Sequence, residues 1–194
     1  MTTDEIWDYL QNHNYFVHHR LYNKFEVTKP SYVEEGEITG KVVLDYGCGY
    51  GRNIAWFTKY ASKCIGVEIN LKIIKEAKKF LEQHGNMKKT LLYLSNNYAQ
   101  HLVSLDYVFC RFVFQHITKA QTQEVMNNIN KYLKIYGKVN LQFRLGTKVQ
   151  IEKMKEPIVE YTLEEISKLL ENIEIENMYV QNSNNVYIIG TKLL

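Results

Sequence analysis

Three glycines at alternate positions follow an apolar run and open a helical pattern. They lie in the stretch Asp45-Tyr46-Gly47-Cys48-Gly49-Tyr50-Gly51. Glycine permits a tight turn and lets a ligand approach the backbone closely. The start of a helix presents N–H groups and a positive dipole end to a carboxylate or a phosphate. The stretch therefore predicts a ligand site at a strand–turn–helix junction.

The spacing of these glycines separates two classes of nucleotide ligand. The dinucleotide fingerprint is GxGxxG, and its third glycine would fall at position 52, which is Arg52. Asp45 instead stands two positions before the first glycine. The pattern therefore argues against an NAD-linked oxidoreductase.

Apolar runs of strand length alternate with helical patterns along the rest of the chain. Runs that are apolar almost throughout suit parallel strands covered on both faces. The expected strands are Lys41–Tyr46, Lys63–Glu68, Thr90–Leu94, Leu105–Cys110, Lys138–Phe143, Ile173–Val180 and Val186–Lys192. The turn between the last two runs, Asn-Ser-Asn-Asn, indicates an antiparallel hairpin.

The expected helices lie between these strands. Amphipathic or helical patterns cover Arg52–Tyr60 and Leu71–Gln83. Two capping-box patterns, one beginning at Thr118 and one at Thr162, predict further helix starts. In the helix after Thr162 we expect four residues to be buried, namely Leu163, Ile166, Leu169 and Leu170.

This alternation predicts an α/β fold. We expect a Rossmann-like, doubly wound, seven-stranded and mostly parallel sheet, with helices on both faces and a C-terminal antiparallel hairpin. A single domain would span residues 1–194, with residues 1–30 as an N-terminal helical lid segment and 38–194 as the Rossmann-like core. Ligands of such sheets bind outside the carboxyl ends of the strands, so functional residues should directly follow strands.

The composition agrees with one soluble domain. The chain has 194 residues, of which 45% are hydrophobic and 23% charged, with a net charge of +3. Lysines and glutamates are interspersed, so we expect no nucleic-acid partner. The longest apolar runs are too short to cross a bilayer and the N-terminus is acidic and polar, so we expect no membrane attachment and a cytoplasmic location. The three cysteines, Cys48, Cys64 and Cys110, form no CxxC pair, so no metal site is expected.

Several motifs carry a family resemblance. Val42–Asn53 (VVLDYGCGYGRN) resembles motif I of the class I S-adenosylmethionine-dependent methyltransferases, and its Gly-Arg-Asn ending is similar to members that act on small molecules. Cys64–Asn70 (CIGVEIN) resembles the family's second-strand motif, and Leu105–Ile117 resembles its fourth-strand motif. Leu133–Leu141 (LKIYGKVNL) resembles the usual LKPGG turn, but isoleucine replaces the proline and Tyr136 replaces the first glycine.

The resemblance implies S-adenosylmethionine as cofactor and S-adenosylhomocysteine as product. In the family, the acid of the second-strand motif holds the ribose hydroxyls, and here it is Glu68. Many relatives carry an aspartate where this chain has Asn96, whose amide oxygen could still accept from the adenine amino group. The expected cofactor-binding residues are Asp45, Gly47, Cys48, Gly49, Gly51, Asn53, Glu68, Ile69, Asn96 and Arg111.

Residues after strands four and five are candidates for the acceptor site. Arg111 and Arg144 would favour a carboxylate or phosphate on the acceptor, but pairing of each arginine with a surface acid is equally consistent with the sequence. His116 has a side chain whose ordinary pKa suits a general base. We favour the alternative that it packs at the start of the next helix.

The sequence therefore predicts a methyltransferase that acts on an oxygen or nitrogen of a small, anionic molecule, as a monomer or homodimer. The alternative is a non-catalytic S-adenosylmethionine-binding subunit or module of a larger methyltransferase complex. Such a module would keep Gly47–Gly51 and Glu68 but lack a working acceptor site.

Overall fold

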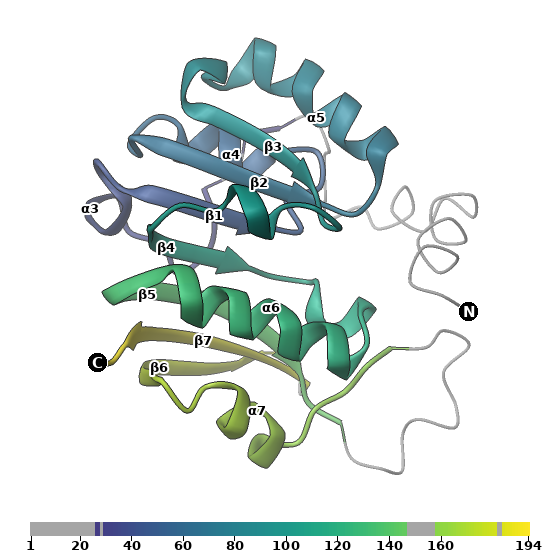
Figure 1. Ribbon diagram of the computed structural model, residues 1–194, viewed down its shortest axis with the longest axis vertical. Coiled ribbons are helices and arrows are strands. Elements are labelled where there is room, and N and C mark those ends of the chain that lie inside the picture. Colours follow the sequence, from purple (N-terminus) through teal and green to yellow (C-terminus); the bar gives the residue numbers. More distant parts are fainter. Residues whose placement is uncertain (1–25, 28, 147–157, 182–183) are drawn as a thin grey trace.

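In the part of the chain that the structure describes, seven strands form one sheet in the order β3-β2-β1-β4-β5-β7-β6 (Figure 1). The computed structural model describes residues 26–27, 29–146, 158–181 and 184–194. Strands β1 to β5 run parallel, and β7 runs antiparallel to both of its neighbours. This arrangement confirms the predicted Rossmann-like sheet and its C-terminal antiparallel hairpin.

The elements alternate along the chain as expected. The strands are β1 (Val42–Tyr46), β2 (Lys63–Glu68), β3 (Thr90–Leu94), β4 (Leu105–Cys110), β5 (Leu133–Arg144), β6 (Ile173–Gln181) and β7 (Asn185–Lys192). The α-helices are α3 (Glu35–Ile38), α4 (Arg52–Phe57), α5 (Leu71–His84), α6 (Lys119–Tyr132) and α7 (Leu163–Leu169). Short 3₁₀ helices are η1 (Met87–Lys89), η2 (Ala99–His101) and η3 (Phe114–His116).

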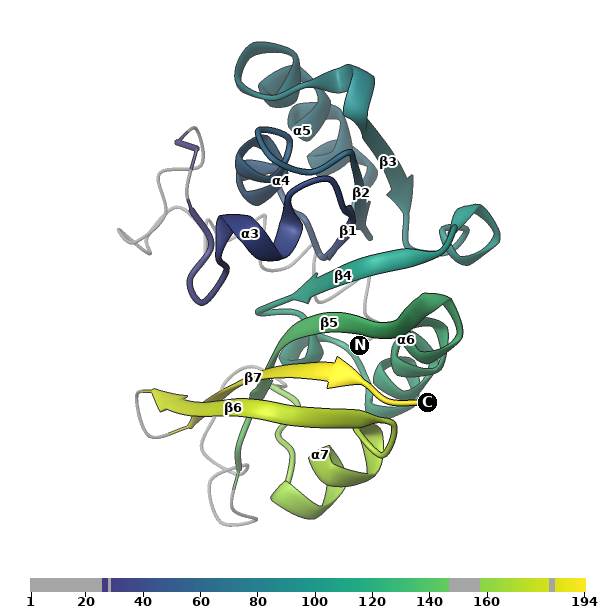
Figure 2. The same cartoon turned by 90° about the vertical axis from the view of Figure 1, so that its left-hand side faces the viewer.

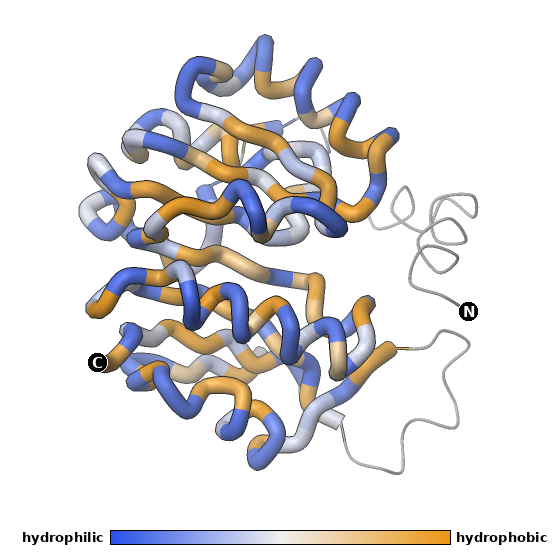
Figure 3. Tube along the Cα trace, in the orientation of Figure 1, coloured by the Kyte–Doolittle hydropathy of each residue, from blue (hydrophilic) through white to orange (hydrophobic). Residues whose placement is uncertain are grey.

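Helices cover both faces of the sheet (Figure 2). On one face, α3, α4 and α5 pack on alternate residues of the central strands, with Val43, Tyr107 and Phe109 in the buried cluster. On the other face, α6 and α7 pack on the intervening residues, such as Val108 and Leu141. Because both faces are covered, the central strands are apolar along most of their length, whereas the helices alternate between apolar and polar residues (Figure 3).

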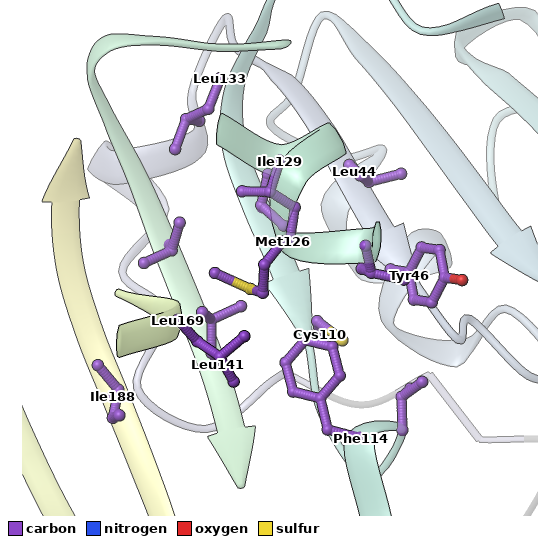
Figure 4. Close-up of a cluster of buried hydrophobic side chains, with 14 of the residues drawn as sticks. Leu44, Tyr46, Cys110, Phe114, Met126, Ile129, Leu133, Leu141, Leu169 and Ile188 are labelled. Carbon is purple, nitrogen blue, oxygen red and sulfur yellow. The ribbon is translucent and has the colours of Figure 1, made fainter. Parts of the chain in front are cut away.

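The larger core lies under α6 and α7 (Figure 4). Met126 and Ile129 of α6 reach toward Leu141 of β5, and Ile188 of β7 continues the same apolar layer. The capping box predicted at Thr118 is present, and its side chain accepts from the Gln121 N–H. This helix therefore begins at a fixed residue and holds its apolar stripe against the sheet.

Strand β5 begins earlier than the sequence predicts. The stretch expected to form a turn, from Leu133 onward, pairs with Leu105 of β4, and an irregularity in register follows between Leu105 and Tyr107. Tyr136 stands in this irregular part with a φ of 62°. This φ explains why a glycine suits the position, because a residue with a Cβ loses about 1–2 kcal/mol of stability in the left-handed conformation.

One prediction about a buried residue is wrong, and one about the N-terminal segment lies mostly outside the described residues. Leu163 was expected in the core but is 57% exposed, because it is the first residue of α7 and lies ahead of the helix's buried stripe. The predicted N-terminal lid, residues 1–30, lies outside the described residues except for 26, 27, 29 and 30.

Candidate cofactor and acceptor site

The glycine turn after β1 is held by the neighbouring strand. Gly47, Gly49 and Gly51 have φ values of 79°, 52° and 80°, which L side chains rarely adopt. The N–H groups of Gly47 and Cys48 both donate to the carbonyl of Val67, at 2.7 and 2.9 Å. These two hydrogen bonds fasten the turn to the end of β2.

The two sides of this turn are packed differently. A Cβ on Gly47 would stand 2.1 Å from Cγ2 of Val113, which lies in the segment after β4. A Cβ on Gly49 would have no heavy atom of the described residues within 4 Å. The turn is therefore closed against the segment after β4 at Gly47 and open at Gly49.

Glu68, the last residue of β2, is buried and organises the turn. Its Oε2 accepts from the Gly49 N–H at 3.1 Å, and its Oε1 accepts from the N–H groups of Ile69 and Asn70 at 2.8 and 3.1 Å. Burial raises the pKa of this carboxyl, and the three N–H donors oppose the rise. A carboxylate offers about four acceptor directions. The three N–H groups occupy three of them, so Glu68 keeps one for a hydroxyl of a ligand.

Asn70 is a positioning residue that the sequence analysis did not single out. Its Oδ1 accepts from the N–H groups of Lys72 and Ile73 at 2.9 and 3.2 Å and so caps α5. Because its own N–H donates to Glu68, the cap also fixes the acid. An Asn before an amphipathic helix was the available sequence signal.

Asp45 is the second buried acid of the site, 2% exposed. Among the described residues, its Oδ2 has no hydrogen-bond partner. Burial and the charge of Glu68 raise its pKa to about 7, against the lowering effects of Arg52 and of a hydrogen bond from Asn53. Two buried acids at one turn repel each other when both are ionised, so the site favours a positively charged ligand group.

The end of β3 adjoins the same acid. The Ser95 N–H donates to the carbonyl of Glu68 at 3.0 Å, which brings the turn after β3 beside the end of β2. Asn96 follows in that turn and is exposed. The structure thus places Asn96, the expected adenine partner, at the carboxyl edge of the sheet, close to Glu68.

The two arginines have different surroundings. Arg144 at the end of β5 pairs with the buried Glu160, with Nε 3.2 Å from Oε1, which is the ion pair that the sequence left open. Arg111 donates from Nη1 to the Ser31 carbonyl at 3.1 Å and lies over the ring of Tyr187, 4.1 Å from its centroid. The structure thus joins Arg111 to the segment before α3 and Arg144 to the segment before α7.

His116 lies in η3, near Arg144. The Gln115 side-chain nitrogen is 3.0 Å from Nε2 of His116. Burial and the positive charge of Arg144 lower the pKa of the imidazole to about 4. The ring is therefore neutral at physiological pH and a weak base, which fits the packing role that we favoured from the sequence.

Two buried polar residues that the sequence analysis did not name lie near the segment after β4, one in β5 and one ahead of α7. Gln142 is 2% exposed and accepts the Phe112 N–H through Oε1 at 2.8 Å. Tyr161 is also buried, and its hydroxyl donates to the Phe114 carbonyl at 3.1 Å. For Gln142, the signal was a polar residue inside an otherwise apolar strand.

Two kinds of feature are absent from the described residues. They contain no group of three or more His, Cys, Asp or Glu side chains placed to hold a metal ion. None of their helices has both the length and the apolar composition needed to cross a membrane.

Comparison with known proteins shows a likeness to methyltransferases. A model of the methyltransferase domain matches residues 43–137, which include the glycine turn, both acids and the segment after β4. The chain is 27% identical over 117 residues to the ribosomal protein L11 methyltransferase of Aliivibrio salmonicida, a match that covers 60% of this chain and 38% of that protein.

Solved structures share its fold. The magnesium protoporphyrin IX methyltransferase of Synechocystis, with bound S-adenosylmethionine, has a TM-score of 0.69 at 15% identity and covers 98% of this chain and 96% of its own. A TehB-like methyltransferase of Corynebacterium glutamicum has a TM-score of 0.64 at 16% identity and covers 97% of each chain. These likenesses support the fold class.

The residues of the site fit the family's cofactor, S-adenosylmethionine. This molecule carries an ammonium, a sulfonium, a carboxylate and a ribose diol, so its net charge is positive. The unpartnered Oδ2 of Asp45 suits the ammonium, and Glu68 suits a hydroxyl of the diol. A dinucleotide brings a negatively charged pyrophosphate instead, which two buried acids would repel.

The pKa of Asp45 predicts a pH dependence of cofactor binding. Below pH 7 the free protein holds Asp45 protonated, so binding an ammonium beside it requires loss of a proton. We expect the affinity for S-adenosylhomocysteine to rise roughly tenfold per pH unit up to about pH 7 and then level off. Calorimetric titration between about pH 5.5 and 8.5, roughly 1.5 units on either side of the pKa, measures how this affinity depends on pH.

Asp45→Asn is the control for this prediction. The variant keeps the shape of the side chain but cannot ionise, so its weaker binding should not change with pH. A wild-type profile that is flat, or a profile that the variant retains, would show that Asp45 does not face the ammonium.

Proposed function

We propose that this protein transfers the methyl group of S-adenosylmethionine to an oxygen or nitrogen of a small acceptor. The observation that carries the proposal is the pair of buried acids, Asp45 and Glu68, on either side of a glycine turn that is open at Gly49. This arrangement matches a cofactor with a diol and positive charges. The cofactor supplies a methyl group already activated by its positive sulfur.

The chain's own residues then have three tasks. Asp45 and Glu68 bind and orient the cofactor from opposite ends. The segment after β4, packed against Gly47 through Val113, forms the wall from which an acceptor is aligned. Alignment of two reactants contributes much of the rate in such a displacement.

The protein offers the acceptor only a weak general base. His116 is neutral but its pKa of about 4 makes it a weak base. We therefore propose an acceptor that needs no deprotonation by the protein before it attacks the methyl group, such as a carboxylate or an aromatic amine. A negative charge on it would be met by Arg111, which follows β4 directly.

Further expectations belong to the same proposal. Residues 1–194 would act as one domain, with residues 1–30 as its N-terminal lid segment, in a cytoplasmic monomer or homodimer that uses no nucleic acid. A protein acceptor is the second candidate, because the relative from Aliivibrio salmonicida is named for a ribosomal protein. That relative is much longer than this chain, since the match spans 38% of it.

A radiolabel experiment separates these possibilities. The protein is incubated with S-adenosylmethionine labelled in the methyl group and a cell extract, which is then divided by ultrafiltration into small molecules and macromolecules. We expect the new label among the small molecules, and none with heat-inactivated enzyme. Label in precipitated protein would favour the second candidate.

No transfer in either fraction would have a separate meaning. If the protein still bound S-adenosylhomocysteine in a calorimetric titration, the result would favour a non-catalytic cofactor-binding module. If it bound neither S-adenosylhomocysteine nor NAD, the proposed function would be wrong.

A further inference from the structure

Phe112 combines two unfavourable features at the carboxyl edge of the sheet. It follows β4 with a φ of 60°, in the left-handed region that bulky residues avoid. The residue is also 41% exposed, which is unusual for a large apolar side chain in a sheet protein. Backbone strain of this kind is concentrated at functional sites, where the surrounding structure holds it in place.

A partly buried chain of hydrogen bonds holds the strained residue. The Phe112 N–H donates to Oε1 of Gln142 at 2.8 Å, and Nε2 of Gln142 donates to Oδ1 of Asn185 at 2.9 Å. The chain therefore links the segment after β4 to β5 and to the start of β7. A buried amide that satisfies a backbone N–H is costly to remove, so Gln142 is well placed to fix Phe112.

The next residue fixes the same segment from the other side. Val113 packs so closely on Gly47 that no side chain fits between them. Phe112 is thus held directly beside the glycine turn at which we place the cofactor. Its ring also lies near the guanidinium of Arg111, with 5.9 Å from the guanidinium carbon to the ring centroid.

Among the described residues, two other non-glycine residues have a positive φ, and their settings differ from that of Phe112. Tyr32 stacks on Tyr179, with 4.4 Å between ring centroids, and its carbonyl accepts from Asn140. Tyr136 lies in the irregular start of β5, far along the sequence from the site, and is 70% exposed. Phe112 alone among these three adjoins the glycine turn, and Tyr136 provides a matched control for strain at an exposed aromatic residue.

We propose that Phe112 contacts the methyl acceptor and selects one with a planar aromatic ring, and that Gln142 is the residue that positions it. An exposed aromatic face beside a guanidinium suits an aromatic acid, which can stack on the ring while its carboxylate faces Arg111. This inference rests on the proposed function, since it names the acceptor class for the same site.

Two probes that differ only in the ring test the proposal. Binding of 4-hydroxybenzoate and of 4-hydroxycyclohexanecarboxylate is measured by saturation-transfer NMR and titration, with the protein saturated with S-adenosylhomocysteine. We expect the planar probe to bind at least about tenfold more tightly. Phe112→Leu, which keeps apolar bulk but removes the planar ring, should abolish this preference and leave the affinity for S-adenosylhomocysteine unchanged.

Four further variants separate positioning from general damage. Gln142→Leu should reduce the preference for the planar probe, and Gln142→Glu, which retains an acceptor oxygen for the Phe112 N–H, should restore most of it. Tyr136→Gly relieves comparable strain away from the site, so it should raise the melting temperature without changing either affinity. Phe112→Gly should raise the melting temperature but lose the preference.

Failure of this inference differs from failure of the proposed function. Equal affinity for the two probes, or a preference that survives in Phe112→Leu, would overturn the role of Phe112 while S-adenosylhomocysteine still binds. Wild-type protein that does not bind S-adenosylhomocysteine would overturn the proposed function, and the acceptor class with it.

Discussion

Replacing Gly47 with alanine should destabilise the protein by about 3–4 kcal/mol, which is a large fraction of a typical domain's stability. The new Cβ would stand 2.1 Å from Cγ2 of Val113, in a segment that has no room to retreat because Gln142 holds the residue before it. Overpacking of this kind costs about 1–3 kcal/mol, and a φ of 79° adds about 1–2 kcal/mol for a residue with a Cβ. Urea unfolding followed by circular dichroism measures the loss.

Gly49→Ala is the matched control within the same turn. Its φ is 52°, but no described heavy atom lies within 4 Å of the new Cβ, so only the backbone strain of about 1 kcal/mol should remain. The open side is where we place the cofactor, and S-adenosylhomocysteine should therefore bind at least about tenfold more weakly to this variant, a loss of about 1.4 kcal/mol.

A double variant tests the stated cause of the Gly47 effect. Val113→Ala in the Gly47→Ala background removes the clashing methyl groups and should recover the overpacking part of the loss, leaving the backbone strain. Equal losses for Gly47→Ala and Gly49→Ala would show instead that strain alone matters and that the contact with Val113 is not important.

Glu68→Ala should weaken S-adenosylhomocysteine binding by about 1.5–3 kcal/mol, or roughly 10- to 150-fold, if the acid holds the ribose through charged hydrogen bonds. The same change leaves the N–H groups of Gly49, Ile69 and Asn70 without their carboxylate. We therefore expect a lower melting temperature as well, and the titration must be made where the variant is fully folded.

Two controls make the Glu68 result specific. Glu68→Gln retains an acceptor oxygen for Ile69 and Asn70 and should recover stability more than affinity, because the amide accepts from only one side. Glu76→Ala removes an exposed acid that pairs with Lys79 and should change neither quantity by much. An unchanged affinity in folded Glu68→Ala would mean that another acid holds the ribose.

The sheet could be predicted from the sequence because its strands are buried on both faces. The run Lys63–Glu68 has the same bounds in the sequence pattern and in the structure, since an apolar run ends where the strand leaves the core. Strand β5 could not be bounded in this way. Its first residues include the exposed Ile135 and Tyr136, and they join the sheet only through an irregular register with β4.

The sequence could predict those residues of the candidate site that lie close together within one motif. The glycine turn and Glu68 follow directly from strand ends, and the motif contains both. The remaining features depend on contacts between distant segments: Val113 reaches Gly47 only because β4 lies beside β1, and Gln142 reaches Phe112 only because β5 lies beside β4. No spacing within one motif encodes these contacts.

The position of β7 between β5 and β6 also affects how the chain can fold during synthesis. Strands β1 to β5 can assemble in the order in which they are made, but β6 emerges before the strand that joins it to the sheet. Until β7 inserts, β5 exposes an unpaired edge that carries Leu141 and Phe143, both fully buried in the finished protein. A nascent chain paused before β7 would therefore present an unpaired, aggregation-prone strand edge to other chains. A chaperone would be most useful at this stage of synthesis.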